Sequence, residues 1–297
     1  MEQYDIVIIG AGPAGISAGI YAVSRGKRVL VLEQNRVGGL IGTVSSVTHY
    51  TGIVPGETGR SFAMRMQQQA QSAGVPVAYE TVRRVCLRDA VKTVETERAV
   101  YQAAKVILAN GTTPRTPAIE GNPALLCRRA AENGPQFDGK NIYVVGGADG
   151  AVKEALYLAQ FAKTLTIIHF EDQLGCVAEF RARVAHTPNI VVKTGMRLHG
   201  VYGTQQIEKI ELRREQDGAI EVIEDAGCGV FVYAGSVPNT ALYPELHLEN
   251  GYIPVDSNMQ TEIPGVYAAG DICVKAVRQV ATAVADGAAA GIHAAQG

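Results

Sequence analysis

The sequence predicts an α/β protein with two Rossmann-like, three-layer domains, and three observations support this fold class. The chain has 297 residues, a length at which a single hydrophobic core usually divides into two domains. Two glycine-rich turns, at 10–15 and 146–151, each follow a short apolar run that is typical of a buried parallel strand. A helical pattern and a second apolar run follow each turn, so the chain contains two βαβ units.

The elements expected in the first half of the chain alternate between apolar runs and helical patterns. The apolar side chains of the second helix recur at helical spacing, and Gly74 ends that pattern. In order, we expect a strand over 4–9, a helix to about residue 25, a strand over 28–32, a helix over 58–73, three short strands within 75–101 and a strand over 105–109.

The second half begins after Pro114 and Pro117 and repeats the βαβ pattern. Asp217-Gly218 is a hairpin turn signal between two strand-like runs. In order, we expect a strand over 141–145, a helix over 150–162, a strand over 164–169, a hairpin of 207–212 with 219–223, a strand over 230–234, short strands after 252 and an alanine-rich helix from about 279.

Composition and charge limit the classes of partner. The net charge of −2 and the pI of about 6.3 give no basic field for nucleic acid or anionic membranes. No leader pattern and no run of about 18 apolar residues is present. The five cysteines include no CxxC pair, so neither a zinc site nor a local dithiol is expected. We therefore expect a cytoplasmic protein with reduced thiols and no bound metal.

The first glycine turn has the spacing of a dinucleotide-binding turn. Gly10 permits a tight turn, Gly12 lets the backbone approach a pyrophosphate, and Gly15 lets the helix pack closely on the strand. The N-terminus of the helix offers unpaired amides and a positive dipole end to phosphates. Glu33 follows the next strand and is placed to accept hydrogen bonds from ribose hydroxyls. These features together predict a dinucleotide site.

The last part of the chain indicates which nucleotide binds there. The segment 261–271 ends in Ala-Ala-Gly270-Asp271 and is similar to the late motif of flavoproteins that bind two dinucleotides. Further matching stretches are Gly38-Gly39 with Thr43, Tyr50-Thr-Gly52, Ala109 to Arg115, Glu154 to Leu158, Pro238 to Thr240, and Arg278 to Val280 with Thr282-Ala283. On these motifs, which cover nearly the whole chain, the sequence resembles the low-molecular-weight thioredoxin reductases, which are pyridine nucleotide-disulfide oxidoreductases.

The resemblance implies a homodimer and a discontinuous FAD-binding domain, 1–114 and 239–297, into which a degenerate NAD(P)-binding-like domain, 115–238, is inserted. It places His49 and Tyr50 near the flavin as the candidate catalytic residues. His49 either transfers protons or is a packing histidine, and Tyr50 either stacks on the flavin or lines its pocket. The residues expected to bind FAD are Gly10, Gly12, Pro13, Ala14, Gly15, Glu33, Gly38, Gly39, Leu40, Thr43, Ala109, Asn110, Gly111, Gly270, Asp271, Arg278, Gln279 and Val280.

The chain departs from this family at the redox dithiol. Counting back from Gly134-Pro135, the family's CxxC falls on Arg129-Ala130-Ala131-Glu132. Without two thiols there, dithiol–disulfide exchange by the family's route is not possible. Cys127 lies two residues before this position and is either a small buried residue or a free nucleophile.

The chain also departs from the family at the NADPH site. The family has three arginines after the second strand of the inserted domain, and the ungapped alignment places Phe170, Glu171 and Gly175 there. A ribose 2′-phosphate needs cationic donors, whereas an acidic residue suits a free 2′-hydroxyl. Ala148 adds a methyl group where the second glycine turn should contact a pyrophosphate. NADPH is therefore disfavoured.

Three interpretations of the function remain open at this point. The first is a FAD-dependent oxidoreductase whose flavin is reduced by a donor other than NADPH, either a ferredoxin- or flavodoxin-like protein or a small reductant. The second adds another adenine dinucleotide, NADH or a second FAD, in the inserted domain. The third is a FAD-binding scaffold or sensor without turnover.

Overall fold

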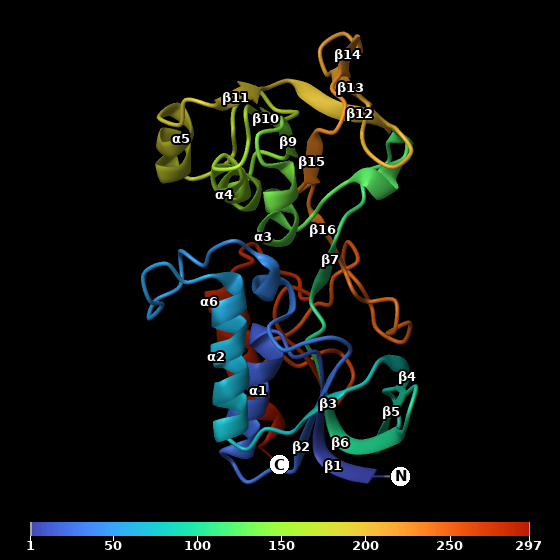
Figure 1. Ribbon diagram of the computed structural model, residues 1–297. Coiled ribbons are helices and arrows are strands. Elements are labelled where there is room, and N and C mark those ends of the chain that lie inside the picture. Colours follow the sequence, from blue (N-terminus) through green and yellow to red (C-terminus); the bar gives the residue numbers. More distant parts are fainter. Residues whose placement is uncertain (1, 297) are drawn as a thin grey trace. The chain divides into compact units, whose positions relative to one another are not determined.

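The computed structural model describes residues 2–296, and these divide into two compact units. The two ends of the chain share unit 1, and the middle of the chain forms unit 2 (Figure 1). Two short strands, β7 (Thr112–Pro114) and β16 (Ser236–Pro238), pair with each other where the chain changes unit. The stretches are 2–42, 46–113 and 237–296 for unit 1, and 43–45 and 114–236 for unit 2.

Unit 1 contains a seven-stranded sheet with the order β3-β2-β1-β6-β5-β4, in which β17 also pairs with β6. β1, β2, β3, β6 and β17 are parallel, and β4 and β5 add an antiparallel edge. The strand order reverses at β1, and such a switch point is where doubly wound sheets bind ligands. The strands are β1 (Glu2–Ile9), β2 (Val29–Glu33), β3 (Val77–Tyr79), β4 (Val82–Cys86), β5 (Lys92–Thr96), β6 (Val100–Leu108) and β17 (Val266–Ala268).

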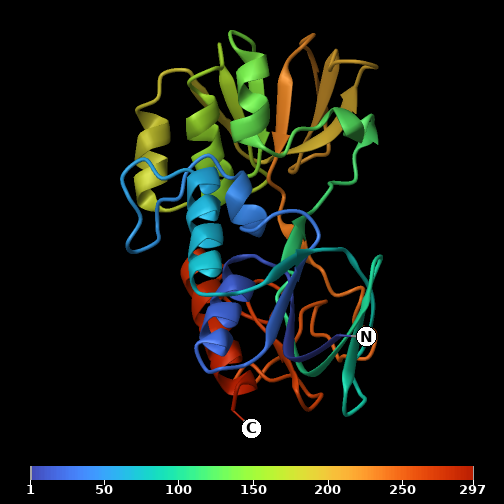
Figure 2. The same cartoon turned by 60° about the horizontal axis from the view of Figure 1, so that its bottom comes forward.

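Three helices cover one face of this sheet: α1 (Pro13–Val23), α2 (Gly59–Ser72) and α6 (Val280–Ala294). Both Figure 1 and Figure 2 show α1 and α6 side by side. Their close approach requires glycine, since a Cβ on Gly287 would lie 2.0 Å from the carbonyl oxygen of Ala14. The opposite face packs against the β4–β5 edge and apolar side chains of residues 242–273.

Unit 2 has three layers. Its central sheet is parallel, with the order β11-β10-β9-β15, and a second sheet has the order β14-β13-β12-β8. One face of the central sheet shares a core with the helices, and the other face shares a core with β12 and β13. The elements are β8 (Glu120–Gly121), α3 (Ala130–Asn133), β9 (Ile142–Val145), α4 (Asp149–Leu158), β10 (Leu165–Ile168), α5 (Ala178–Ala185), β11 (Ile190–Lys193), β12 (Met196–Tyr202), β13 (Lys209–Arg214), β14 (Ile220–Glu224) and β15 (Gly229–Val232).

Three short 3₁₀ helices complete the described structure: η1 (Gly39–Thr43), η2 (Pro123–Leu125) and η3 (Gly134–Phe137). The helix expected over 150–162 ends earlier, at Leu158, and the strand expected over 105–109 is the end of the longer β6. Helix α5 and strands β11 and β12 are among the elements that were not predicted, and α5 has no clear apolar period in the sequence. Both βαβ units form as the apolar runs and glycine turns predict.

Candidate functional site

The first glycine turn joins β1 to α1 with a geometry that only glycine permits at two positions. Gly10 has φ +104°, and a Cβ on it would lie 2.5 Å from the carbonyl oxygen of Ala109. A Cβ on Gly15 would lie 1.8 Å from the carbonyl oxygen of Gly10. Gly12 differs from both, because a Cβ on it would meet no described atom within 4 Å. Gly12 therefore faces open space at the N-terminus of α1, where a phosphate group fits.

Glu33 ties the end of β2 to this turn. Its side chain is buried, and Oε2 accepts a hydrogen bond from the amide of Ala11 at 2.9 Å. Oε1 accepts from the amide of Asn35 at 2.8 Å. Each carboxylate oxygen accepts more than one hydrogen bond, so Glu33 has capacity left for a ribose hydroxyl.

Asp271 follows β17 and has a buried carboxylate oxygen that no described residue satisfies. Its Oδ1 atom is buried and has no hydrogen-bond partner among the described residues. Burial raises the pKa of Asp271, while Lys275 and Arg278 lower it. Asp286, by contrast, accepts from the amide of Gly270 at 3.0 Å and pairs with Lys275. An unsatisfied buried carboxylate oxygen beside the glycine turn fits a polyol chain such as the ribityl group of FAD.

The segment at Gly38-Gly39 lies against the first glycine turn. The amide of Gly38 donates to the carbonyl of Ala11 at 2.9 Å, and a Cβ on Gly39 would lie 3.5 Å from the Cα of Gly12. Leu40 is 43% exposed. Thr43 ends η1 and is grouped with unit 2.

The segment after β6 also lines the turn, through its backbone. Ala109 packs beneath Gly10, and Gly111 has φ +58°. The side chain of Asn110 is engaged within unit 1, because Nδ2 donates to the carbonyl of Asn239 at 2.8 Å and Oδ1 accepts from Tyr243 at 2.7 Å. The contribution of Asn110 to this site is therefore structural.

Arg278, Gln279 and Val280 lead into α6. The guanidinium of Arg278 lies 4.1 Å from the ring centroid of Tyr252, and Nη2 donates to the carbonyl of Cys273 at 3.2 Å. Gln279 precedes the first turn of α6, which Val280 begins. The stacking partner Tyr252 was missed in the sequence because an isolated tyrosine in a loop gives no pattern.

The two candidate catalytic residues lie in the loop before α2. His49 is exposed, and Tyr50 is partly buried with its ring edge-on to Phe62 of α2, 5.5 Å between centroids. The structure therefore fixes Tyr50 by packing, and His49 remains accessible.

The second glycine turn keeps the backbone geometry of the first. Gly146 has φ +132°, and a Cβ on it would lie 2.5 Å from the carbonyl oxygen of Tyr233. Ala148 precedes α4 with φ −81° and ψ 171°, close to the φ −73° and ψ −176° of Gly12 in the first turn. In the second turn, the methyl group of Ala148 thus occupies the space that corresponds to the open space at Gly12 in the first turn.

The segment after β10 contains Phe170, Glu171 and Gly175, the three positions at which the resemblance led us to expect arginines. His169 is buried against Gly147, and its Nε2 lies 3.1 Å from Oε2 of Glu171. A Cβ on Gly175 would lie 4.0 Å from the same carboxylate oxygen. Phe170 is 45% exposed. An aromatic ring and a carboxylate therefore occupy this corner.

The expected dithiol position lies at the start of α3 and is occupied by an exposed ion pair. Nη1 of Arg129 contacts Oε2 of Glu132 at 2.9 Å. Cys127 forms a β-bridge with Phe231, and burial raises the pKa of its thiol. A neutral, half-buried thiol is a poor nucleophile, which favours the packing interpretation of Cys127.

Comparison with known proteins identifies the family. The model of the pyridine nucleotide-disulphide oxidoreductase family matches residues 4–287, so the chain belongs to this family. The thioredoxin reductase of Treponema pallidum is 37% identical over 293 residues, which cover 97% of this chain and 95% of that protein. The thioredoxin reductase of Peptoclostridium litorale is 34% identical over 301 residues, with 98% and 96% covered.

Solved structures agree with this assignment. The thioredoxin reductase of Lactococcus lactis superposes with a TM-score of 0.93 at 30% identity and covers 98% of this chain and 97% of that one. A ferredoxin-flavin thioredoxin reductase from Clostridium acetobutylicum gives 0.56 at 27% identity, with 100% and 98% covered. The predicted fold class is therefore confirmed, and the protein is a thioredoxin reductase-like, FAD-dependent oxidoreductase.

Among residues 2–296, no helix is long and apolar enough to cross a membrane. No group of three or more His, Cys, Asp and Glu side chains in the same range is arranged to hold a metal ion.

Proposed function

We propose that the flavin of this oxidoreductase receives its electrons from a donor other than NADPH, either a ferredoxin- or flavodoxin-like protein or a small reductant. The observation that carries this proposal is the corner after β10. Where the family has arginines, this chain has Phe170, Glu171 and Gly175, and a Cβ on Gly175 would contact the carboxylate of Glu171. A phosphate dianion at this corner would meet a carboxylate instead of cationic donors.

The acceptor side supports the same proposal. The ion pair between Arg129 and Glu132 stands where the resemblance places the family's dithiol, and without two thiols there, transfer to thioredoxin by that route is not available. Electrons would instead leave from the flavin itself. His49 is the candidate for proton transfer beside it, and Tyr50 for holding the ring in place.

The residues of unit 1 that we assign to FAD are those around the first glycine turn, Glu33, and the buried Asp271. Bound FAD would supply the redox chemistry, and the protein would bind and orient it. We assign FAD to the domain formed by 1–114 and 239–297 and regard 115–238 as the inserted domain. The family resemblance further supports a homodimeric assembly in the cytoplasm.

The test is anaerobic reduction of the flavin-loaded protein by NADPH, NADH and reduced ferredoxin in parallel. Flavin absorbance is the readout of each reaction. We expect reduced ferredoxin to bleach the flavin and NADPH to leave it oxidised. Rapid bleaching by NADPH, or NADPH oxidation that depends on thioredoxin, would contradict the proposal. A yellow protein that no donor reduces would favour a scaffold or sensor.

A second candidate function is the binding of a further adenine dinucleotide, NADH or a second FAD, by the inserted domain. The backbone of the second glycine turn favours it, since Ala148 has nearly the same φ and ψ as Gly12. Nucleotide stoichiometry and flavin reduction by NADH test it. One flavin per chain, together with no reduction by NADH, would exclude it.

A further inference from the structure

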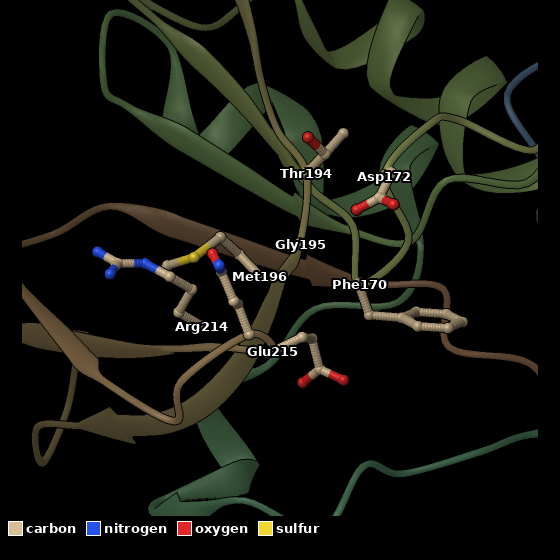
Figure 3. A pocket seen from close by; sticks show the side chains of 8 residues that line it. Phe170, Asp172, Thr194, Gly195, Met196, Arg214 and Glu215 are labelled. Atoms are coloured by element: carbon tan, nitrogen blue, oxygen red, sulfur yellow. The ribbon is translucent and has the colours of Figure 1, made fainter.

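Unit 2 has a cavity of about 440 Å³ beyond the carboxyl ends of β10 and β11. Doubly wound sheets bind nucleotides outside the carboxyl ends of their strands, so the cavity is at the expected edge. Its wall includes Phe170 and Asp172 after β10, and Arg214 and Glu215 at the end of β13. Figure 3 shows the side chains of Phe170 and Glu215 on one side of the cavity, with the guanidinium of Arg214 pointing away from them.

One more cation reaches this corner from β12. The guanidinium carbon of Arg197 lies 4.4 Å from the ring centroid of Phe170. Its Nε and Nη2 atoms donate to the two carboxylate oxygens of Glu215 at 3.0 and 3.1 Å. This hydrogen-bonded pair lowers the pKa of Glu215 and raises the pKa of Arg197. Such a two-point pair occupies the Nε–Nη2 edge, one of the donor edges through which a guanidinium binds phosphate.

Backbone hydrogen bonds hold this pair in register with the corner after β10. The amide of Glu215 donates to the carbonyl of Gly195 at 2.8 Å, and the amide of Gly195 donates to the carbonyl of Glu171 at 3.1 Å. Three loops that are distant in sequence are thereby connected. The backbone of Glu215 is consequently held at the cavity, and the two hydrogen bonds from Arg197 orient its carboxylate.

We infer that Glu215 determines the specificity of this cavity and restricts it to nucleotides whose ribose 2′-hydroxyl carries no phosphate. By engaging Arg197, Glu215 removes a cation that would otherwise be available to a 2′-phosphate. Its own charge, with those of Glu171 and Asp172, repels a dianion and accepts hydrogen bonds from ribose hydroxyls. The inference rests on both proposals above, that NADPH is not the donor and that the inserted domain binds a further adenine dinucleotide. It assigns the exclusion of the 2′-phosphate to a residue outside positions 170, 171 and 175.

The test compares NAD⁺ with NADP⁺, which differ only in the 2′-phosphate and do not reduce the flavin. Binding to the flavin-loaded full chain is measured by calorimetry at low salt. We expect the wild type to bind NAD⁺ at least about tenfold more tightly than NADP⁺, a difference of about 1.4 kcal/mol. Glu215→Gln should shift this ratio about tenfold or more towards NADP⁺, and the added substitution Arg197→Ala should abolish the shift.

Asp217→Asn is the matched control, because Asp217 pairs with Arg214 at 2.9 Å on the same hairpin. It removes the same charge but frees the guanidinium of Arg214, which lines the cavity and points away from Phe170, so its shift should be smaller than that of Glu215→Gln. An unshifted ratio in Glu215→Gln, an equal shift in Asp217→Asn, a wild-type preference for NADP⁺, or no binding of either nucleotide would each overturn the inference. Flavin bleaching by NADPH tests the proposed function separately, so the two can fail independently.

Discussion

Gly12→Ala separates what the protein needs at the first glycine turn from what its ligand needs. The backbone of Gly12, φ −73° and ψ −176°, is open to alanine, and a Cβ there would meet no described atom within 4 Å. The free energy of unfolding of the flavin-free protein should therefore change by no more than about 0.5 kcal/mol. If a pyrophosphate occupies that space, the methyl group should cost about 1–3 kcal/mol of binding, or roughly tenfold to a hundredfold in the dissociation constant of FAD.

Gly15→Ala is the matched control, because its Cβ would lie 1.8 Å from the carbonyl oxygen of Gly10. The backbone must shift there, and we expect a loss of about 3 kcal/mol or more from the flavin-free protein. Denaturant unfolding of the apoprotein measures stability, and quenching of flavin fluorescence on titration measures affinity. A Gly12→Ala protein with unchanged FAD affinity, or with a destabilised apoprotein, would refute the reasoning.

Three further predictions concern stability. Asp271→Asn should weaken FAD binding about tenfold and stabilise the apoprotein by roughly 1 kcal/mol at neutral pH. Because burial raises the pKa of Asp271, the stability of the wild-type apoprotein falls as the pH rises through that folded-state pKa. The free energies of unfolding of wild type and variant, plotted against pH, should therefore meet in acid. Gly150→Ala should add about 0.4–1 kcal/mol, since its Cβ meets no described atom within 4 Å, whereas Gly287→Ala should lose stability in the same thermal unfolding assay. Arg129→Ala breaks an exposed ion pair with Glu132 and should change the free energy of unfolding by less than about 1 kcal/mol; a larger loss would mean that the pair has a structural role.

The fold was predictable because its signals are local in the sequence. A buried parallel strand, a glycine turn and a helix are contiguous at 4–23, and their pattern is set by sterics between near neighbours. The close approach of α6 to α1 was not predictable, because Gly287 gives no sign in the sequence of the carbonyl that it meets. The engagement of Asn110 by Asn239 and Tyr243 was missed for the same reason.

The corner after β10 shows how much can be inferred when a sequence lacks an expected motif. The sequence predicts correctly that Phe170 and Glu171 follow this strand. It does not show which charged side chains from other elements contact these two residues. In the structure, the ring of Phe170 supports Arg197 from β12, and Glu215 from the next hairpin engages that cation. Counting the cations near this corner would therefore overestimate its affinity for phosphate. The affinity for phosphate depends on whether the donor edge of each guanidinium is free. That in turn depends on contacts between residues far apart in the chain.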